Sequence, residues 1–115
     1  MAVKRFEDLI VWQKAQDLAV LVFEIYKLNK DYSFKEQIWR ASISVSNNIS
    51  EGFDRSSNPD FIRFLNIART SCNEVKSMLY LACRIQYIND LQKDNFISKT
   101  EEISRIIFAL IKTLK

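Results

Sequence analysis

One stretch, residues 39–55, is rich in hydroxyl, amide and charged side chains that could do chemistry, and it reads WRASISVSNNISEGFDR. One possible chemistry is proton transfer by a carboxylate pair, Glu51 with Glu74, beside an anion held by Arg40. Another is nucleophilic attack by a serine, but the chain has no histidine to act as the usual base. We therefore assign no catalytic residue and expect a protein that is not an enzyme.

A structural role explains the same stretch better. At ~100° per residue, small and apolar side chains share one face of a helix, which predicts a core-facing stripe. Beside it runs a polar stripe in which Glu51 is spaced to pair with Arg55 along the helix. We predict that a polar network at the edge of the core sets the register of the second and third helices. Its expected members are Arg40, Ser44, Asn48, Glu51 and Glu74, together with Ser71.

Metal and cofactor chemistry has no support in the residue pattern. The sequence contains no glycine-rich phosphate loop and no metal-ligand spacing. At ~1.5 Å per residue, Cys72 and Cys83 lie ~16 Å apart on one expected helix, which is too far for a disulfide. We expect no cofactor and no bound metal.

The elements that position these residues are expected to be helices. The chain has 115 residues, 48% of them apolar, with one glycine and one proline. Strand and hairpin architectures need more residues of those two types at their turns. The N-terminus lacks the pattern of a signal peptide, and no apolar run reaches the ~18 residues of a membrane span. We expect a cytoplasmic protein that does not enter a membrane.

Apolar periodicity and capping signals predict four helices. The first runs over residues 6–28 and the second over residues 33–55, beginning at a Ser33–Glu36 capping box. The third follows an Asn58 cap and ends near residue 87. The last lies within residues 91–114, with Asp94 and Ser98 as alternative caps. Short connections favour antiparallel neighbours, so we predict an all-α, antiparallel up-down four-helix bundle that forms a single domain over residues 1–115.

The first helix has a wider apolar arc than one core stripe requires. Such surplus is either covered by loops and neighbouring helices or forms a contact between subunits. We predict a homo-oligomer whose interface contains Trp12, Phe23, Tyr26 and Trp39.

Three segments together resemble a bacterial four-helix-bundle family, the 23S rRNA intervening sequence proteins, which includes accessory variability proteins of diversity-generating retroelements. The segments are FEDLIVWQKAQDLA, QIWRASISVSNNISEG and FIRFLNIARTSCNEV, and they cover most of the chain. The opening motif is met by Phe6, Leu9, Trp12 and Ala15; the central motif is met by Gln37, Arg40, Ala41, Ser44, Asn48, Ile49, Glu51 and Gly52. The resemblance implies a pentameric ring that binds nucleic acid and a reverse transcriptase.

One face of the third helix has the composition of a nucleic-acid contact. Its side chains recur every three or four residues and include no acid: Asn66, Arg69, Asn73, Lys76, Tyr80 and Arg84. Cations can contact phosphates while tyrosine stacks on a base, although an ordinary solvated face has a similar composition. Our hypothesis is weak RNA or DNA binding through Arg69, Lys76, Arg84 and Tyr80. The alternative is a structural or protein-interaction module without a nucleic-acid role.

Overall fold

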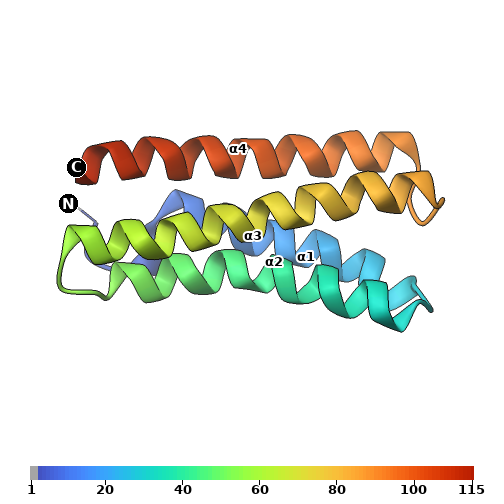
Figure 1. Cartoon of the computed structure of the whole chain (residues 1–115), viewed down its shortest axis with the longest axis horizontal. Coiled ribbons are helices and arrows are strands. Elements are labelled where there is room, and N and C mark those ends of the chain that lie inside the picture. Colours follow the sequence, from blue (N-terminus) through green and yellow to red (C-terminus); the bar gives the residue numbers. More distant parts are fainter. Residues whose placement is uncertain (1–2) are drawn as a thin grey trace.

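The computed structural model describes residues 3–115. A short 3-10 turn, η1 (Phe6–Asp8), precedes four helices: α1 (Ile10–Leu28), α2 (Tyr32–Phe53), α3 (Asn58–Arg84) and α4 (Asp90–Leu114). Figure 1 shows each helix running antiparallel to the one before it, and α1 also contacts α4, which closes the bundle. No strand occurs within residues 3–115. The all-α four-helix bundle predicted from the sequence is confirmed.

The core is formed by the apolar stripes that the sequence pattern indicated. All residues at the expected helical spacing on α3 are buried: Phe61, Phe64, Leu65, Ala68, Cys72, Val75, Leu79 and Ala82. The corresponding stripe of α2 is buried as well: Ile38, Ala41, Ser42, Val45, Ile49 and Gly52. On α4 the burial is less complete, because Ile106 and Leu110 are half-buried at the edge. The predicted stripes of α2 and α3 thus form the centre of the core, and α4 covers it at the edge.

The predicted start of α2 was wrong, and the cap of α3 lies one residue earlier than expected. Asp31 caps α2 by accepting from the Phe34 amide at 3.1 Å, so the helix begins before Ser33 and no capping box forms with Glu36. Ser57 caps α3 through the Asp60 amide at 3.3 Å. In both places the capping side-chain oxygen belongs to a residue one or two positions before the predicted cap, and it accepts the hydrogen bond from the free backbone amide.

The first helix also begins later than predicted. Leu9 adopts an extended conformation between η1 and α1, so the segment from Phe6 is not one continuous helix. The turn places the Phe6 ring against Trp12, with ring centroids 5.3 Å apart. The interruption of the helix at Leu9 therefore coincides with the packing of Phe6 on Trp12.

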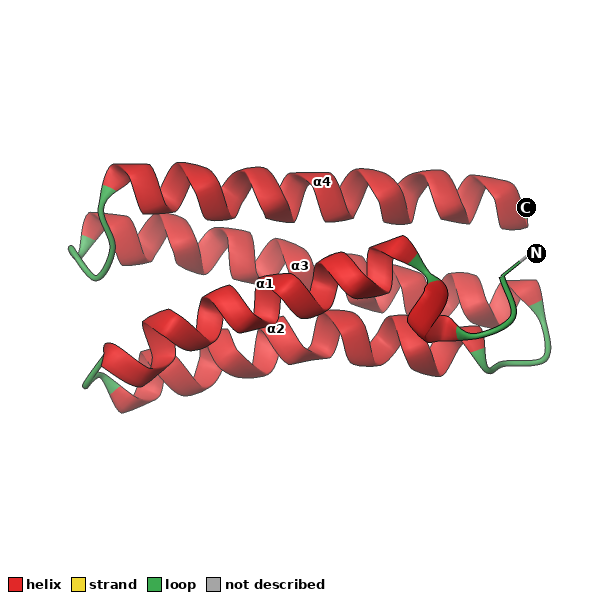
Figure 2. Cartoon of the chain, turned by 180° about the vertical axis from the view of Figure 1, so that it is seen from behind, coloured by secondary structure: helices red, strands yellow, loops and turns green. Residues whose placement is uncertain are grey.

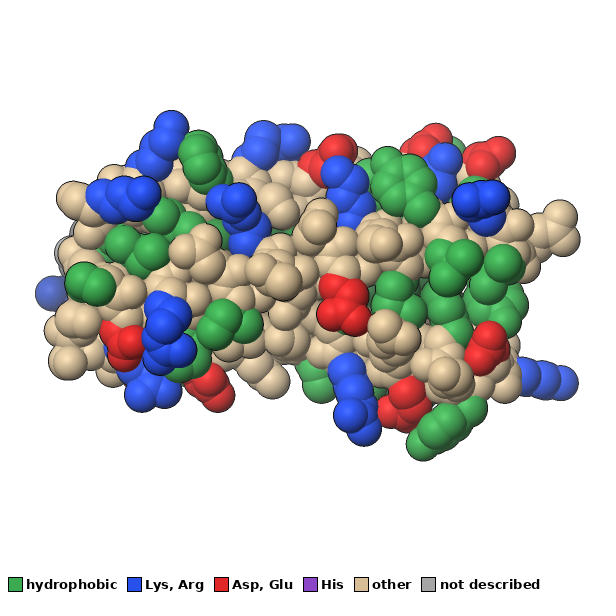
Figure 3. All heavy atoms as spheres, in the orientation of Figure 1, with side chains coloured by type: hydrophobic (Ala, Val, Ile, Leu, Met, Phe, Trp, Pro, Cys, Tyr) green, Lys and Arg blue, Asp and Glu red, His purple; other side chains and the backbone are tan. Residues whose placement is uncertain are grey.

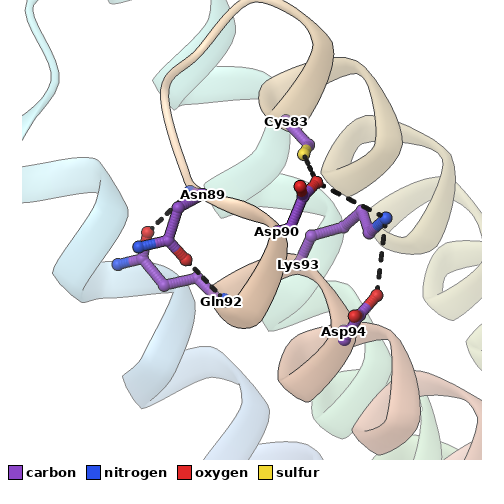
Figure 4. Close-up of polar contacts among 6 residues, drawn as sticks. All are labelled: Cys83, Asn89, Asp90, Gln92, Lys93 and Asp94. Atoms are coloured by element: carbon purple, nitrogen blue, oxygen red, sulfur yellow. Dashed lines mark hydrogen bonds and ion pairs between the residues drawn. The ribbon is translucent and has the colours of Figure 1, made fainter.

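Asn89, just beyond the predicted end of the third helix, is the cap of α4. Its side chain accepts from the Gln92 amide at 2.8 Å, and the Gln92 side chain accepts from the Asn89 amide at 2.9 Å (Figure 4). This reciprocal capping box starts α4 at Asp90, ahead of both alternative caps. α3 ends at Arg84, before the predicted residue 87, because Gln86 adopts a positive φ of 66° and turns the chain.

One end of the bundle is closed by a hydrogen bond between two connections. Figure 2 shows the α1–α2 and α3–α4 connections at the same end. There the Tyr87 hydroxyl donates to Asp31 Oδ2 at 2.6 Å. This bond, with the Phe34 amide, lowers the pKa of the Asp31 carboxyl from its ordinary value. The residue that caps α2 thus also ties the two helical pairs together.

α2 and α3 approach each other closely at Gly52. A Cβ atom placed there would lie 2.6 Å from Phe64 Cβ and 2.9 Å from a Phe61 ring carbon. Both distances are shorter than real Cβ contacts, and Phe64 Cβ is held by its own helix. Glycine is therefore the residue type that allows α2 and α3 to pack this closely at position 52.

We predict that Gly52→Ala destabilises the protein by about 1–3 kcal/mol, the usual range for overpacking a core. This loss should appear although alanine is intrinsically better than glycine in a helix by ~1 kcal/mol. Urea unfolding followed by circular dichroism measures it. Asn47→Ala, on the exposed side of α2, is the control and should change stability by no more than ~0.5 kcal/mol; a stabilised Gly52→Ala variant would contradict the contact.

Candidate nucleic-acid interface

A groove runs between α3 and α4 on the outside of the bundle. Positions three and four residues apart, just outside the core stripes, line its two walls, and it encloses about 530 Å³. The lining residues are Arg69, Thr70, Asn73 and Lys76 from α3 and Glu101, Ser104 and Arg105 from α4. Three cations, three neutral hydrogen-bonding side chains and one acid therefore face a shared space.

The charges in this groove are only partly neutralised. Lys76 Nζ lies 3.2 Å from Glu101 Oε2, whereas within residues 3–115 Arg69 and Arg105 form no ion pair. The Arg69 guanidinium lies instead over the Phe108 ring, 5.6 Å from its centroid. Figure 3 shows lysine and arginine gathered over the α3–α4 edge toward the C-terminus, with acidic side chains from the middle of that edge onward. This half of the edge is the more positive one.

The structure separates the four predicted nucleic-acid residues. Arg69 and Lys76 line the groove, while Tyr80 and Arg84 lie one and two turns further along α3 and do not line it. Tyr80 is 48% exposed. The sequence showed no acid within this face of α3, but α4 supplies one, Glu101, that pairs with Lys76.

The far end of the face is more acidic. Lys93 approaches the Tyr80 ring at 5.9 Å and is itself paired with Asp94 at 3.4 Å and Asp90 at 3.9 Å (Figure 4). These contacts raise the pKa of the Lys93 ammonium, chiefly through Asp94. An anion approaching Tyr80 therefore meets a cation that already has two acidic neighbours.

Sequence reasoning missed Arg105 and Phe108. Both lie on α4, and Phe108 is 48% exposed with Lys112 Nζ 4.6 Å from its ring centroid. A signal was present, because residues 103–115 contain Arg105, Lys112 and Lys115 but no acidic side chain. Only the packing of α4 beside α3 brings Arg105 next to Arg69 in one groove.

The polar residues of α2 form a smaller network than predicted. The Ser44 and Ser71 hydroxyls lie 2.8 Å apart across the α2–α3 boundary. Asn48 donates to the Ser44 carbonyl at 2.8 Å and to the Ser44 hydroxyl at 2.9 Å. Within residues 3–115 no buried side-chain nitrogen or oxygen lacks a partner.

Arg40 and Glu74 lie outside this network. Arg40 is 81% exposed and reaches Glu36 at 3.8 Å. Glu74 accepts a hydrogen bond from Gln37 at 3.3 Å, so its contact with α2 lies about two helical turns before Ser44 and about three before Asn48. Each forms its own local contact at the surface.

Glu51 does not form the predicted pair with Arg55, and that prediction is wrong. α2 ends at Phe53, so the helical spacing that would join the two side chains is lost. Arg55 lies over the Phe64 ring at 4.6 Å instead, and Glu51 has no ion pair or side-chain hydrogen bond within residues 3–115. Since Gln37 rather than Glu51 faces Glu74, the two carboxylates do not form a catalytic pair.

The predicted interface residues fall into two groups. Phe23, Tyr26 and Trp39 form an aromatic cluster with ring centroids 5.6–5.9 Å apart. Trp12 lies near the other end of α1 and packs on Phe6. Phe23 is 41% exposed, while Tyr26 and Trp39 are half-buried, so the cluster is partly satisfied within one chain.

Both cysteines are free thiols in local hydrogen bonds. Cys72 is buried and contacts the Thr100 carbonyl at 3.4 Å. Cys83 contacts Asp90 Oδ1 at 3.1 Å (Figure 4), and this acceptor raises the pKa of the Cys83 thiol. In residues 3–115 no group of histidine, cysteine, aspartate and glutamate side chains is arranged to hold a metal ion. Nor is any helix of that part both long and apolar enough to span a bilayer.

Comparison with known families agrees with this architecture. The family model described as 23S rRNA-intervening sequence protein matches residues 7–109. The chain belongs to this family. The match spans the α3–α4 groove and the Gly52 contact, and it confirms the resemblance seen in the sequence motifs.

A solved structure supports the same assignment to the 23S rRNA-intervening sequence protein family. It is a crystal structure of a protein with unknown function from the S23 ribosomal protein family of Bacteroides thetaiotaomicron. The two share 32% sequence identity with a TM-score of 0.86, over 90% of this chain and 99% of that chain. No curated protein matches the chain.

The polar network allows two residues of the central motif to be distinguished. We predict that Asn48→Leu lowers the free energy of unfolding by about 1–2 kcal/mol, because the Ser44 carbonyl and hydroxyl both lose a donor. Glu51→Gln should change it by no more than ~0.5 kcal/mol, as expected for an exposed side chain without a partner. Urea titrations compare the two variants, and equal losses would contradict the smaller network.

Proposed function

We propose that this protein is a non-enzymatic, homo-oligomeric nucleic-acid-binding protein. The observation that supports this most directly is the α3–α4 groove, where neutral polar side chains lie between Arg69 and Arg105. Neither arginine has an acidic partner among residues 3–115. Cations contact phosphates, and hydroxyl and amide groups add hydrogen bonds to phosphate or sugar oxygens. Arg84, exposed beyond the groove, extends this surface as an outer contact.

The expected affinity of one groove is low. The whole chain has a net charge of +3, and Glu101 neutralises part of the groove through Lys76. Binding of this kind depends on counterion release and weakens steeply with salt. Several copies on one assembly would hold a long RNA or DNA strand more tightly than one groove alone, because the later contacts are intramolecular.

Two separate apolar surfaces support self-association. One is the aromatic cluster on α1 and α2, where Val20 adds a side chain that is 62% exposed. The other lies near the C-terminal end of α3, where Leu81 and Ile85 are 48% and 44% exposed, and Figure 3 shows hydrophobic side chains gathered at this end. A cyclic oligomer of more than two subunits forms when one surface of each subunit contacts a different surface of the next. Two separate apolar surfaces fit the pentamer that the family resemblance implies.

The second candidate function is protein scaffolding without nucleic acid. The exposed Leu81 and Ile85 favour it, since exposed apolar side chains can form a contact with another protein. A reverse transcriptase is the partner that the resemblance implies. In this case the groove cations would serve only solubility, and binding would not depend on them.

We predict that replacing Arg69, Lys76 and Arg105 together with glutamine abolishes salt-sensitive binding of oligonucleotides. Three lost phosphate contacts should reduce the slope of log affinity against log salt by about 2 for a single strand. Fluorescence anisotropy over a salt series measures both quantities. Glu101→Gln should act in the opposite direction and strengthen binding, because it frees Lys76 and removes the acid from the groove.

A matched control removes the same charge elsewhere. Lys14, Lys27 and Lys99 lie outside the groove, the first two on α1 and the third on α4. Their combined replacement with glutamine should leave most of the affinity intact. Equal losses in the two triple variants would show a general charge effect and would exclude a site in the groove.

We predict that Phe23→Gln lowers the solution mass of the oligomer, measured by light scattering at several concentrations. Loss of an anchoring aromatic side chain should raise the dissociation constant by about tenfold or more. Phe108→Gln changes a similarly exposed phenylalanine on α4 and should leave the mass unchanged. A wild-type protein with the mass of one chain would overturn the oligomeric part of the proposal.

A further inference from the structure

Two exposed aromatic rings flank the α3–α4 groove, one beyond each end. Phe108 lies at the end nearer the C-terminus, level with Arg69, and Tyr80 lies beyond Lys76 at the other end. Each ring is 48% exposed. From Arg69 to Tyr80 is ~16 Å along α3 at ~1.5 Å per residue. The cations of the groove lie between the two rings.

The rings are not required by the core. Phe64, Phe61 and Phe96 are buried and fill the interior, whereas Tyr80 and Phe108 are each nearly half open to solvent. Leaving an aromatic side chain this exposed forgoes the free energy that burial would supply. Within residues 3–115 the Tyr80 hydroxyl also makes no side-chain hydrogen bond. Both rings thus have surface available for a ligand.

Cations lie next to each ring. Arg69 and Lys112 lie 5.6 Å and 4.6 Å from the Phe108 ring centroid, and Lys93 lies 5.9 Å from that of Tyr80. A base stacked on Phe108 would therefore bring its phosphates near two cations, whereas Lys93 beside Tyr80 is already paired with Asp90 and Asp94. Proteins that bind single strands combine aromatic platforms with a positive groove in this way.

A duplex cannot use the same arrangement. Its bases are already stacked on one another, so an exposed ring gains no base face unless a base leaves the stack at a cost of a few kcal/mol. Phosphate contacts alone would remain, and in this groove Glu101 opposes one of them. The rings therefore discriminate between strands that are paired and strands that are not.

We propose that the groove binds single-stranded RNA or DNA in preference to duplex, with Phe108 and Tyr80 stacking bases at its two ends. Arg69, Lys76 and Arg105 contact the backbone between them. This inference rests on the proposed function, because it assigns a ligand class to the same groove. It adds the prediction that affinity depends on ring faces as well as on charge.

The test compares three fluorescently labelled probes by anisotropy: oligouridylate, oligothymidylate and a DNA hairpin with the same number of phosphates. The wild-type protein should bind both single strands more tightly than the hairpin. Tyr80→Ala with Phe108→Ala should weaken single-strand binding by about tenfold or more and leave the hairpin unchanged. Tyr80→Phe with Phe108→Trp retains both ring faces and should retain the preference.

Tyr32→Ala is the matched control, since Tyr32 is an exposed aromatic residue of α2 outside the groove. It should change none of the three affinities, and thermal unfolding should show that all variants remain folded. Unchanged single-strand binding by the alanine pair, or an equal loss on the hairpin, overturns the stacking inference. The proposed function fails separately, if the glutamine triple variant at Arg69, Lys76 and Arg105 still binds every probe as the wild type does.

Discussion

The structure depends on how closely α2 can approach α3. At Gly52 the two helices meet so tightly that even a methyl group would overlap Phe64 Cβ. Further along the same boundary, the Ser44 and Ser71 hydroxyls join across the helices at 2.8 Å. Close approach at one end and a hydrogen bond in the middle leave one register available, because sliding either helix would separate the serines and drive side chains into the glycine position.

That register determines where the outer faces of α3 lie. Once Phe61, Phe64 and Leu65 point into the core, Arg69 and Lys76 must point toward α4. The α4 capping box at Asn89 and Gln92 then sets the start of the last helix, so that Glu101 faces Lys76 and Arg105 faces Arg69. The groove is therefore a consequence of packing decided elsewhere in the bundle.

The surface divides into regions with different physical character. The α3–α4 edge toward the C-terminus has cations and exposed aromatic rings, whereas the beginning of α4 has Asp90 and Asp94 around Lys93. The aromatic cluster of Phe23, Tyr26 and Trp39 lies on α1 and α2, away from the groove. The aromatic cluster and the groove therefore occupy different sides of the bundle.

The sequence by itself determined the fold class, the helix order and almost the whole core. Apolar residues at helical spacing are a local property, and a chain with one glycine and one proline has few ways to form anything but helices. It also identified Ser44, Asn48, Arg69 and Lys76 as polar residues just outside the core. Helix ends were less certain, because neighbouring side chains such as Asp31 and Ser33 compete for one free amide.

Only the tertiary structure decided which residues share a site. Arg105 and Phe108 are more than 30 residues from Arg69 along the chain, and no periodicity within one helix relates them. Conversely, Glu51 and Arg55 had suitable spacing, but the end of α2 at Phe53 removed the helical turn between them. Periodicity indicates which face of its own helix a residue occupies. Contact between helices depends on their register instead. Side-chain volumes at a few close contacts, such as Gly52, determine that register.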